Sequence, residues 1–389
     1  MNAPAVIPYG RQHVDQDDID AVTAVLQSDW LTQGPVVPAF ETAMASRCHA
    51  QHAVAVNSAT SALHLACLAL GVGPGDLVWT SPISFVASAN CALYCGADVD
   101  FVDIDPDTCN LSPAVLRDKL LQAQKIGRLP KVVIPVHLCG RPCDMETIHA
   151  LAMEFGFKII EDASHAVGAH YMGQPVGNCR YSDIAVFSFH PVKVITSAEG
   201  GMALTNNPVL AQRMSLLRSH GITREPAQLR EPNEGPWYYE QIELGWNYRM
   251  TEIQAALGLS QLTKLDAFVQ KRTSLARRYD DLLSHANLKL PTQETDSASS
   301  HHLYVVRVSA LERRRIFESL RQEGIGVNVH YIPIYKQPFY RSRSSAFMHC
   351  PEAENYYSEA ISLPLFPQME INSQEYIANT LRNLAKVAI

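Results

Sequence analysis

The feature that most constrains this chain is a run of short apolar segments that alternates with helical patterns between residues 52 and 206. The apolar segments, which we expect to be strands, lie at 52–56, 76–80, 99–104, 131–138, 158–162, 184–189 and 201–206. The helical patterns lie at 15–28 and 37–48, before the first strand, and at 59–71, 85–94, 112–125 and 145–156. Such alternation is typical of βαβ units, so we predict an α/β fold with a mainly parallel, seven-stranded sheet.

The sequence after residue 248 has a different pattern. One continuous helical periodicity covers 251–283, which is long enough to pass from one domain to another. The elements expected after it are a strand at 302–308, a helix at 310–322, a strand at 326–331 and a helix from about 373. We therefore expect a large domain over 1–248, with an N-terminal arm, and a smaller α+β domain over 249–389 that the long helix enters.

Charge and hydropathy exclude several classes of protein. The 389 residues include 32 Lys and Arg against 39 Asp and Glu, a formal net charge of −7, which argues against a dedicated nucleic-acid binder. No apolar run approaches the roughly 18 residues that a membrane-spanning helix needs. The first ten residues, MNAPAVIPYG, lack the basic segment and apolar run of a signal peptide. We expect a cytoplasmic protein without a membrane partner, and small anionic ligands stay possible.

The nine cysteines are irregularly spaced and odd in number, which indicates reduced thiols in the cytoplasm. Cys91 and Cys95 are four residues apart, as are Cys139 and Cys143, a spacing that could suggest a metal site. The first pair, however, falls in a helix of small residues, and cysteine is a common core residue. We therefore expect no metal.

Candidate binding residues follow four of the predicted strands. They are Asn57–Ser61 after the first strand, Phe85 after the second, Asp162 at the end of the fifth, and Ser188 and Lys193 at the sixth. In an open parallel sheet, ligands bind beyond the carboxyl ends of the strands. One fold would therefore bring these separate segments to a single edge of the sheet.

Each of these residues also has an ordinary structural explanation. Lys193 is the one lysine of FSFHPVKVITSAEGGM (187–202), and a lysine at a strand end is usually a surface residue, although it can be kept neutral to attack a carbonyl. Asp162 alone would be a helix N-cap. NSATSAL (57–63) could be simple Ser/Thr capping or a helix start that binds phosphate. Phe85 alone is more simply a core aromatic.

Together, these residues match the needs of pyridoxal 5'-phosphate. Lys193 would form the Schiff base, and Asp162 would pair with the cationic ring nitrogen, because a buried carboxylate is costly without a cation. Ser188 could add a hydroxyl to the phosphate site, and Phe85 could stack on the ring. Gly200–Gly201 would let the backbone pass close by.

In this order, the motifs resemble the DegT/DnrJ/EryC1/StrS family of sugar aminotransferases, nearly from end to end. The segments that carry the resemblance are LTQGPVVPAFE (31–41), NSATSALHLA (57–66), SPISFVASAN (81–90), EDASHAVGAHY (161–171), FSFHPVKVITSAEGG (187–201), GWNYRMTEIQAALGLSQL (245–262) and ISLPLF (361–366). The resemblance implies the fold-type-I architecture of pyridoxal-phosphate transferases and an amino-transfer reaction.

The resemblance also implies roles for particular residues. Lys193 would be the catalytic residue that bonds to the cofactor, and Asn247 would reach the phosphate of the neighbouring subunit's cofactor in a homodimer with shared sites. The cofactor contacts it implies are Thr60, Ser61, Phe85, Asp162, His165, Ser188, Lys193 and Asn247. The substrate contacts it implies are Tyr9, Asp29, Trp30, Leu31, Thr32, Ser61, Ser188, Asn247, His330 and Tyr331.

Within the family, SPISFVASAN and SFHPVK most resemble the transaminases of pseudaminic-acid biosynthesis. That resemblance implies a UDP-linked 4-keto-6-deoxy-N-acetylhexosamine, aminated at C4, and L-glutamate as the amino donor. One alternative is an aminotransferase for a dTDP- or GDP-linked keto sugar. Two further alternatives are a pyridoxal-phosphate sugar dehydratase, whose relatives carry histidine at the position of Lys193, and a non-catalytic regulator on the same fold.

Overall fold

The computed structural model describes residues 6–231, 234–292, 296–342 and 349–386. Its centre is a seven-stranded sheet with the strand order β1-β9-β8-β5-β4-β2-β3. These strands are β1 (His52–Val56), β2 (Leu77–Thr80), β3 (Asp98–Phe101), β4 (Val132–Ile134), β5 (Lys158–Asp162), β8 (Ile184–Ser188) and β9 (Gly201–Thr205). β9 is antiparallel to both neighbours, and the other pairs are parallel. The predicted mainly parallel, seven-stranded sheet is confirmed.

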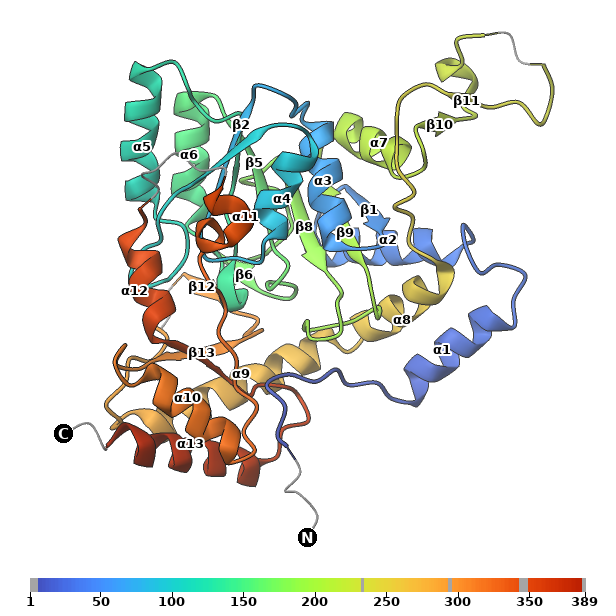
Figure 1. Ribbon diagram of the computed structural model, residues 1–389. Helices are drawn as coiled ribbons and strands as arrows, with labels where there is room; N and C mark the ends of the chain where they lie inside the picture. The colour runs from blue at the N-terminus through green and yellow to red at the C-terminus, as the bar shows by residue number, and fades with distance from the viewer. Residues whose placement is uncertain (1–5, 232–233, 293–295, 343–348, 387–389) are drawn as a thin grey trace.

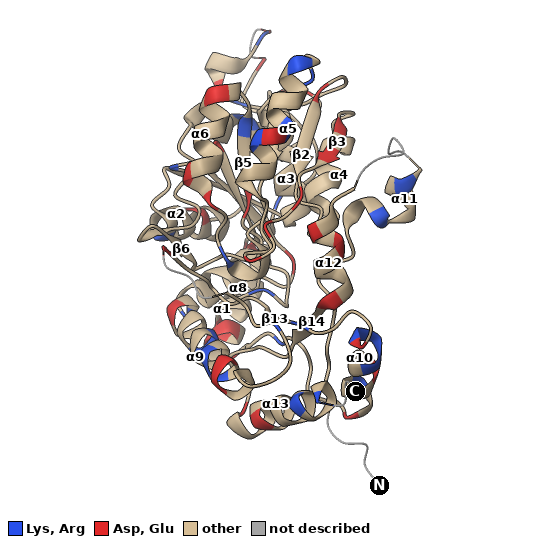
Figure 2. Cartoon of the chain, turned by 90° about the vertical axis from the view of Figure 1, so that its left-hand side faces the viewer, with Lys and Arg blue, Asp and Glu red and all other residues tan. Residues whose placement is uncertain are grey.

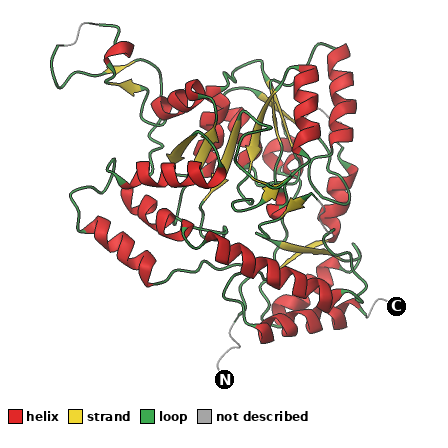
Figure 3. Cartoon of the chain, turned by 180° about the vertical axis from the view of Figure 1, so that it is seen from behind, coloured by secondary structure: helices red, strands yellow, loops and turns green. Residues whose placement is uncertain are grey.

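Helices cover both faces of this sheet, as Figures 1 and 3 show from opposite sides. α3 (Ala59–Ala69), α4 (Ala87–Tyr94) and α7 (Pro208–Leu217) pack on one face. α2 (Val36–Cys48), α5 (Pro113–Lys125), α6 (Met145–Phe155) and α8 (Glu252–Leu262) pack on the other. Val54 and Val56 of β1 join the first core and Ala55 joins the second, because successive strand residues point to opposite faces.

The single long helix expected over 251–283 is in fact two helices. α8 ends at Leu262, and α9 (Leu265–Leu283) begins three residues later. At Thr263 and Lys264 the backbone bonds run to residues three positions back, and the Thr263 hydroxyl also donates to the Ser260 carbonyl at 2.7 Å. A hydroxyl that competes for a helix carbonyl in this way favours a break in the helix.

A further core packs against α9. It is built from β13 (Tyr304–Arg307), α10 (Arg313–Gln322), β14 (Ala360–Leu363) and α13 (Ile371–Ala385). The strand expected at 326–331 is wrong, because only Asn328 forms a bridge, to Ser362, and β14 pairs with β13 instead. The buried apolar run of β14 suits a strand, whereas 326–331 carries polar side chains that face a cavity. The domain boundary at 248/249 stays a prediction.

The remaining elements lie around these cores. They are α1 (Gln16–Leu26), α11 (Pro338–Arg341), α12 (Pro351–Glu359), β6 (His170–Tyr171), β7 (Gln174–Pro175), β12 (Ser297–Ala298), β10 (Ile222–Thr223) and β11 (Glu240–Gln241). The unexpected β10–β11 hairpin projects from the body of the molecule (Figure 1). Figure 2 shows acidic and basic residues mixed along the outer helices. Within the described ranges, no helix is both long and apolar enough to cross a bilayer.

Candidate active site

A cavity of about 670 Å³ opens where β5 and β8 end and α3 begins. The predicted site residues that line it are Tyr9, Thr60, Phe85, Asp162, His165, Ser188, Lys193, His330 and Tyr331. Of the predicted segment Asn57–Ser61, Ser58 and Ala59 also line it. Residues that line it without having been predicted include Ser84, Ser164, His190, Glu199, His302, Asn328 and Gln337. Ser61, Asn247 and the turn Asp29–Thr32 do not line it within this chain. The edge of the sheet expected from the strand ends is therefore where the cavity lies.

Lys193 follows β8 in a tight turn, in which its backbone N–H donates to the His190 carbonyl at 2.9 Å. Its side chain faces the cavity together with Asp162. Burial lowers the pKa of Lys193 to about 8, and the charge of Asp162 opposes this by raising it. A substantial share of the amine is therefore neutral near physiological pH, which a nucleophilic lysine requires.

Asp162 is buried and held by two hydrogen bonds. Its Oδ2 accepts from the Ser88 hydroxyl at 2.6 Å, and its Oδ1 accepts from the Ser164 backbone N–H at 3.1 Å. Because Asp162 also lines the cavity, its remaining lone pairs are available to a cationic group there.

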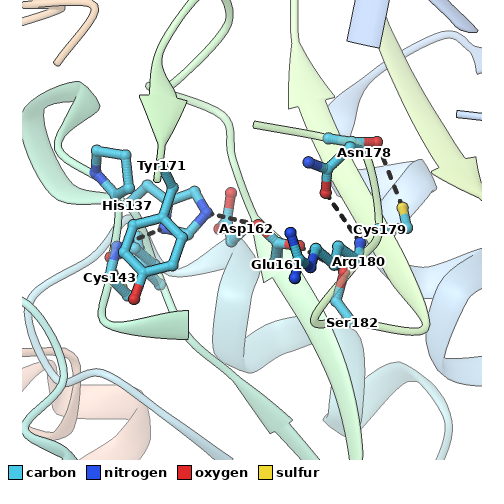
Figure 4. A network of polar contacts seen from close by, with 12 residues as sticks. His137, Cys143, Glu161, Asp162, Tyr171, Asn178, Cys179, Arg180 and Ser182 are labelled. Carbon is cyan, nitrogen blue, oxygen red and sulfur yellow. Dashed lines mark hydrogen bonds and ion pairs between the residues drawn. The ribbon is translucent and has the colours of Figure 1, made fainter. Parts of the chain in front are cut away.

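Glu161 precedes Asp162 on β5 and points to the opposite face of the sheet. Its Oε2 accepts from His137 Nε2 at 2.8 Å, and its Oε1 accepts from the Ser182 hydroxyl. Figure 4 shows Glu161 between these two partners. Since the Cys143 backbone N–H donates to His137 Nδ1 at 3.1 Å, the Nε2 of that ring is the donor to Glu161. Both oxygens of Glu161 are thus satisfied within the protein.

The start of α3 presents backbone amides to the cavity. Ser58 is the N-cap, and its side chain accepts from the Ser61 N–H at 3.2 Å. The N–H groups of Ala59 and Thr60 come before the first intrahelical bond, and both residues line the cavity. Free amides at a helix N-terminus favour a phosphate group.

Gly201, at the start of β9, allows the sheet to approach this helix end. A Cβ at Gly201 would lie 2.4 Å from the Ala59 nitrogen, a contact that no larger residue avoids without moving the backbone. A Cβ at Gly200 would lie 2.2 Å from the Ser197 hydroxyl oxygen. Neither position has room for a side chain, and the expected passage of this backbone beside the cofactor stays a prediction.

Neutral histidines form another wall of the cavity. His165 Nδ1 accepts from the Cys139 backbone N–H at 3.3 Å, and its Nε2 lies 3.2 Å from the Tyr331 hydroxyl. The His302 ring lies 4.3 Å from the His165 ring, centroid to centroid. Burial, reinforced by Lys193, lowers the pKa of His165 well below its usual value. Burial together with His165 and Lys193 does the same for His302.

His302 was not predicted, because it stands at the beginning of the predicted strand 302–308, whereas ligand contacts are expected at the carboxyl ends of strands. Its Nδ1 is buried and has no hydrogen-bond partner among the described residues. A buried nitrogen without a partner, in the wall of a cavity, fits a site that is completed by a ligand.

Two predicted segments lie elsewhere on the chain. The backbone of Asn247 bridges to Ser219, and Thr32 bridges to Thr251 near the start of α8. In the turn before α2, Trp30 and Leu31 are about half exposed. Their expected contacts with cofactor and substrate stay predictions.

Pyridoxal 5'-phosphate fits this arrangement. Lys193, Asp162, the amides that start α3 and the exposed ring of Phe85 correspond to a covalent anchor, a partner for the ring nitrogen, a phosphate site and a stacking surface. The sheet order and this site define a fold-type-I, pyridoxal-phosphate-dependent aminotransferase. The chain belongs to the DegT/DnrJ/EryC1/StrS aminotransferase family, whose sequence model matches residues 12–382.

Named relatives cover almost the whole chain. The UDP-4-amino-4,6-dideoxy-N-acetyl-beta-L-altrosamine transaminase of Campylobacter jejuni is 38% identical over 381 residues, 97% of this chain and 96% of that protein. Helicobacter pylori PseC, an aminotransferase of pseudoaminic acid biosynthesis, superposes with a TM-score of 0.88 at 32% identity, over 98% of this chain and 99% of that one. Spr1654 of Streptococcus pneumoniae, described as a sugar aminotransferase and solved in its PLP form, gives 0.89 at 30% identity over 99% and 100%. The predicted family, cofactor and reaction class are confirmed.

Proposed function

We propose that this protein transfers an amino group from L-glutamate to C4 of a UDP-linked 4-keto-6-deoxy-N-acetylhexosamine, in pseudaminic-acid biosynthesis. The observation that carries the proposal is the cavity in which Lys193, with its pKa lowered to about 8, faces Asp162. The names of the C. jejuni and H. pylori relatives support the choice of sugar. We place the reaction in the cytoplasm, where free thiols such as the nine of this chain stay reduced.

The residues of the chain would divide the work as follows. When bound, the cofactor supplies an electron sink for the removal of a proton from the amino donor. Lys193 holds the cofactor covalently and, once released, takes and returns that proton with its neutral amine. Asp162 keeps the ring nitrogen protonated, the first amides of α3 hold the phosphate, and Phe85 covers the ring.

The same cavity has room for a nucleotide sugar. Its volume of about 670 Å³ lies within the range of ligand sites, roughly 300–1,000 Å³. Tyr9, His330 and Tyr331 line the side formed by the N-terminal arm and the C-terminal part of the chain, where we place the sugar. Lysine rather than histidine at position 193 favours amino transfer over dehydration. A dTDP- or GDP-linked keto sugar remains the alternative substrate.

The test combines cofactor mapping with a substrate panel. Borohydride reduction of the loaded protein should fix the cofactor to the peptide that contains Lys193, and Lys193→Ala should abolish transamination without changing the circular dichroism spectrum. Incubation with glutamate and UDP-, dTDP- and GDP-linked keto sugars should give an amino sugar chiefly from the UDP substrate. A cofactor adduct on another lysine would overturn the site, and preference for another nucleotide would overturn the substrate.

The working unit that we propose is a homodimer with shared sites. Asn247 and the turn Asp29–Thr32 lie outside the cavity of their own chain, so a symmetric dimer in which each subunit completes the other's site would give both a role. Lys193→Ala and Asn247→Asp, each inactive alone, should regain activity after subunit exchange, up to about half per heterodimer. If exchange is demonstrated and no activity returns, Asn247 does not act across the interface.

A further inference from the structure

Behind Asp162, two serines form a buried chain of hydroxyl groups. Ser84 and Ser88 place their Oγ atoms 2.7 Å apart, and Ser88 Oγ lies 2.6 Å from Asp162 Oδ2. The three residues are at most 4% exposed. Ser84 lines the cavity, whereas Ser88 does not, so Ser88 can act on a ligand only through its neighbours, of which Asp162 is the charged one.

The direction of this chain follows from its acceptor. An ionised carboxylate only accepts hydrogen bonds, so Ser88 is the donor to Asp162. The other acceptor within reach of the Ser88 hydroxyl, the Phe85 carbonyl, is farther away at 3.3 Å, and a bond to a charged group is the stronger of the two. Because the one hydrogen of Ser88 is used in this way, Ser84 donates to Ser88.

The carboxylate is therefore fixed at both oxygens before any ligand arrives. Ser88 holds Oδ2, the Ser164 N–H holds Oδ1, and the free lone pairs face the cavity. Ser88 lies in the first turn of α4 and Phe85 lies just before that helix, so one short segment would carry both the stacking surface and the hydroxyl that holds the carboxylate.

We propose that Ser88, aligned by Ser84, is a positioning residue that holds the Asp162 carboxylate aimed at the ring nitrogen of the cofactor. The proposal rests on the proposed function, in which Asp162 pairs with that nitrogen. A plain structural role for Ser88, as a hydroxyl that packs α4 against the sheet, would affect stability but not the chemistry of the cofactor.

The structure offers a matched control on the other face of β5. The Ser182 hydroxyl donates to Glu161 as the Ser88 hydroxyl donates to Asp162. Ser182→Ala and Ser88→Ala therefore each remove a hydroxyl group that donates to a buried carboxylate. The two carboxylates, Glu161 and Asp162, are adjacent on β5. Only Ser88→Ala touches a carboxylate that lines the cavity.

The experiment compares Ser88→Ala, Ser84→Ala, Ser182→Ala and Asp162→Asn in the cofactor-loaded protein. The readouts are the absorbance of the bound cofactor across pH, and kcat and KM of the first half-reaction with glutamate. For Ser88→Ala we expect kcat to fall about tenfold with KM changed less than about twofold, the scale of one bond to a charged group. Its pH titration should shift in the direction that Asp162→Asn shifts, by less, with Ser84→Ala smaller again and Ser182→Ala unchanged.

The outcomes separate the two proposals. If Asp162→Asn shifts the titration and Ser88→Ala does not, the positioning role is wrong and the proposed function stands. If Asp162→Asn itself leaves the spectrum and kcat unchanged, the pairing in the proposed function fails, and the role of Ser88 fails with it. Should Ser88→Ala yield no folded protein, Ser84→Ala decides, and a titration like that of the wild type overturns the proposal.

Discussion

Two neighbouring carboxylates, Glu161 and Asp162, show how one strand serves structure on one face and chemistry on the other. Both are almost fully buried, with 5% and 4% of their surface exposed. His137 and Ser182 donate hydrogen bonds to both oxygens of Glu161. Asp162 accepts from Ser88 and from a backbone amide, and it still faces a cavity. They differ, therefore, in whether the protein itself supplies every partner.

The difference shows what makes a buried charge functional. A carboxylate without a counter-charge is expensive in a protein interior, so the fold must either complete its contacts or leave room for a cation to do so. The histidine behind the sheet completes the contacts of Glu161. Asp162 instead shares its cavity with Lys193, whose pKa is lowered to about 8, so this amine is partly neutral near physiological pH. The ring nitrogen of the cofactor can then serve as the cation that pairs with Asp162.

The largest expected effect comes from neutralising each carboxylate in turn. Asp162→Asn should lower kcat by about 100- to 1,000-fold, the scale of losing one electrostatic contact to the reacting group, because an amide cannot keep the ring nitrogen protonated. Glu161→Gln should keep kcat within a few-fold of wild type, because Glu161 does not line the cavity. Steady-state kinetics of both variants, at matched cofactor occupancy, provide the measurement.

Occupancy is the necessary control, because both variants must be compared as loaded protein. Cofactor content is read from absorbance after release in alkali. Equal losses of kcat in the two variants would show that the faces of β5 are not functionally distinct. An Asp162→Asn enzyme within a few-fold of wild type would remove the pairing from the mechanism.

The next effect concerns stability. His137→Ala should lower the free energy of unfolding by about 3 kcal/mol, because it leaves Glu161 Oε2 buried without its donor, although Oε1 keeps the Ser182 hydroxyl. The double variant His137→Ala/Glu161→Gln should be more stable than His137→Ala alone, since it replaces the incompletely bonded charge with a neutral amide. Denaturant unfolding of the cofactor-free proteins measures both, and a double variant less stable than the single one would contradict the account.

The contrast between the two faces also marks what the sequence could predict. Short apolar runs identified every strand of the central sheet, and the rule that ligands lie at strand ends brought Asp162, Ser188 and Lys193 to one cavity. These are local signals, because each depends on a few consecutive residues. Glu161 and Asp162 both stand at the end of the same strand, and Asp162, which the sequence singled out, is the one that lines the cavity.

Contacts between distant segments were the part that could not be predicted. Ser88 and His302 follow no strand-end rule, and they reach the site because α4 and the C-terminal part of the chain pack there. A threonine hydroxyl bonds a helix carbonyl at the break between α8 and α9, and the segment 326–331 meets β14 only through the bridge between Asn328 and Ser362 while β14 pairs along its length with β13. Such outcomes depend on contacts between segments that are distant in the sequence, and hydrophobic periodicity reports only on local structure.

The smallest effect is on the titration of Lys193 in the cofactor-free protein. Burial lowers the pKa of this amine to about 8, and the Asp162 charge is the contribution that raises it. Acetylation of Lys193 by acetic anhydride, which requires the neutral amine, should therefore rise with pH around a midpoint near 8, well below the roughly 10.4 of a free lysine. Asp162→Asn should move that midpoint lower, because the amine loses the charge that stabilises its protonated form, and Glu161→Gln should leave it in place.

Mass spectrometry of the Lys193 peptide after short exposure at each pH gives the midpoint, with an exposed lysine such as Lys158 as the internal reference. A midpoint near 10 in the wild type would mean that the cavity does not desolvate Lys193, and an equal shift in both variants would mean that Lys193 does not distinguish the carboxylate on its own side of the sheet from the one behind it.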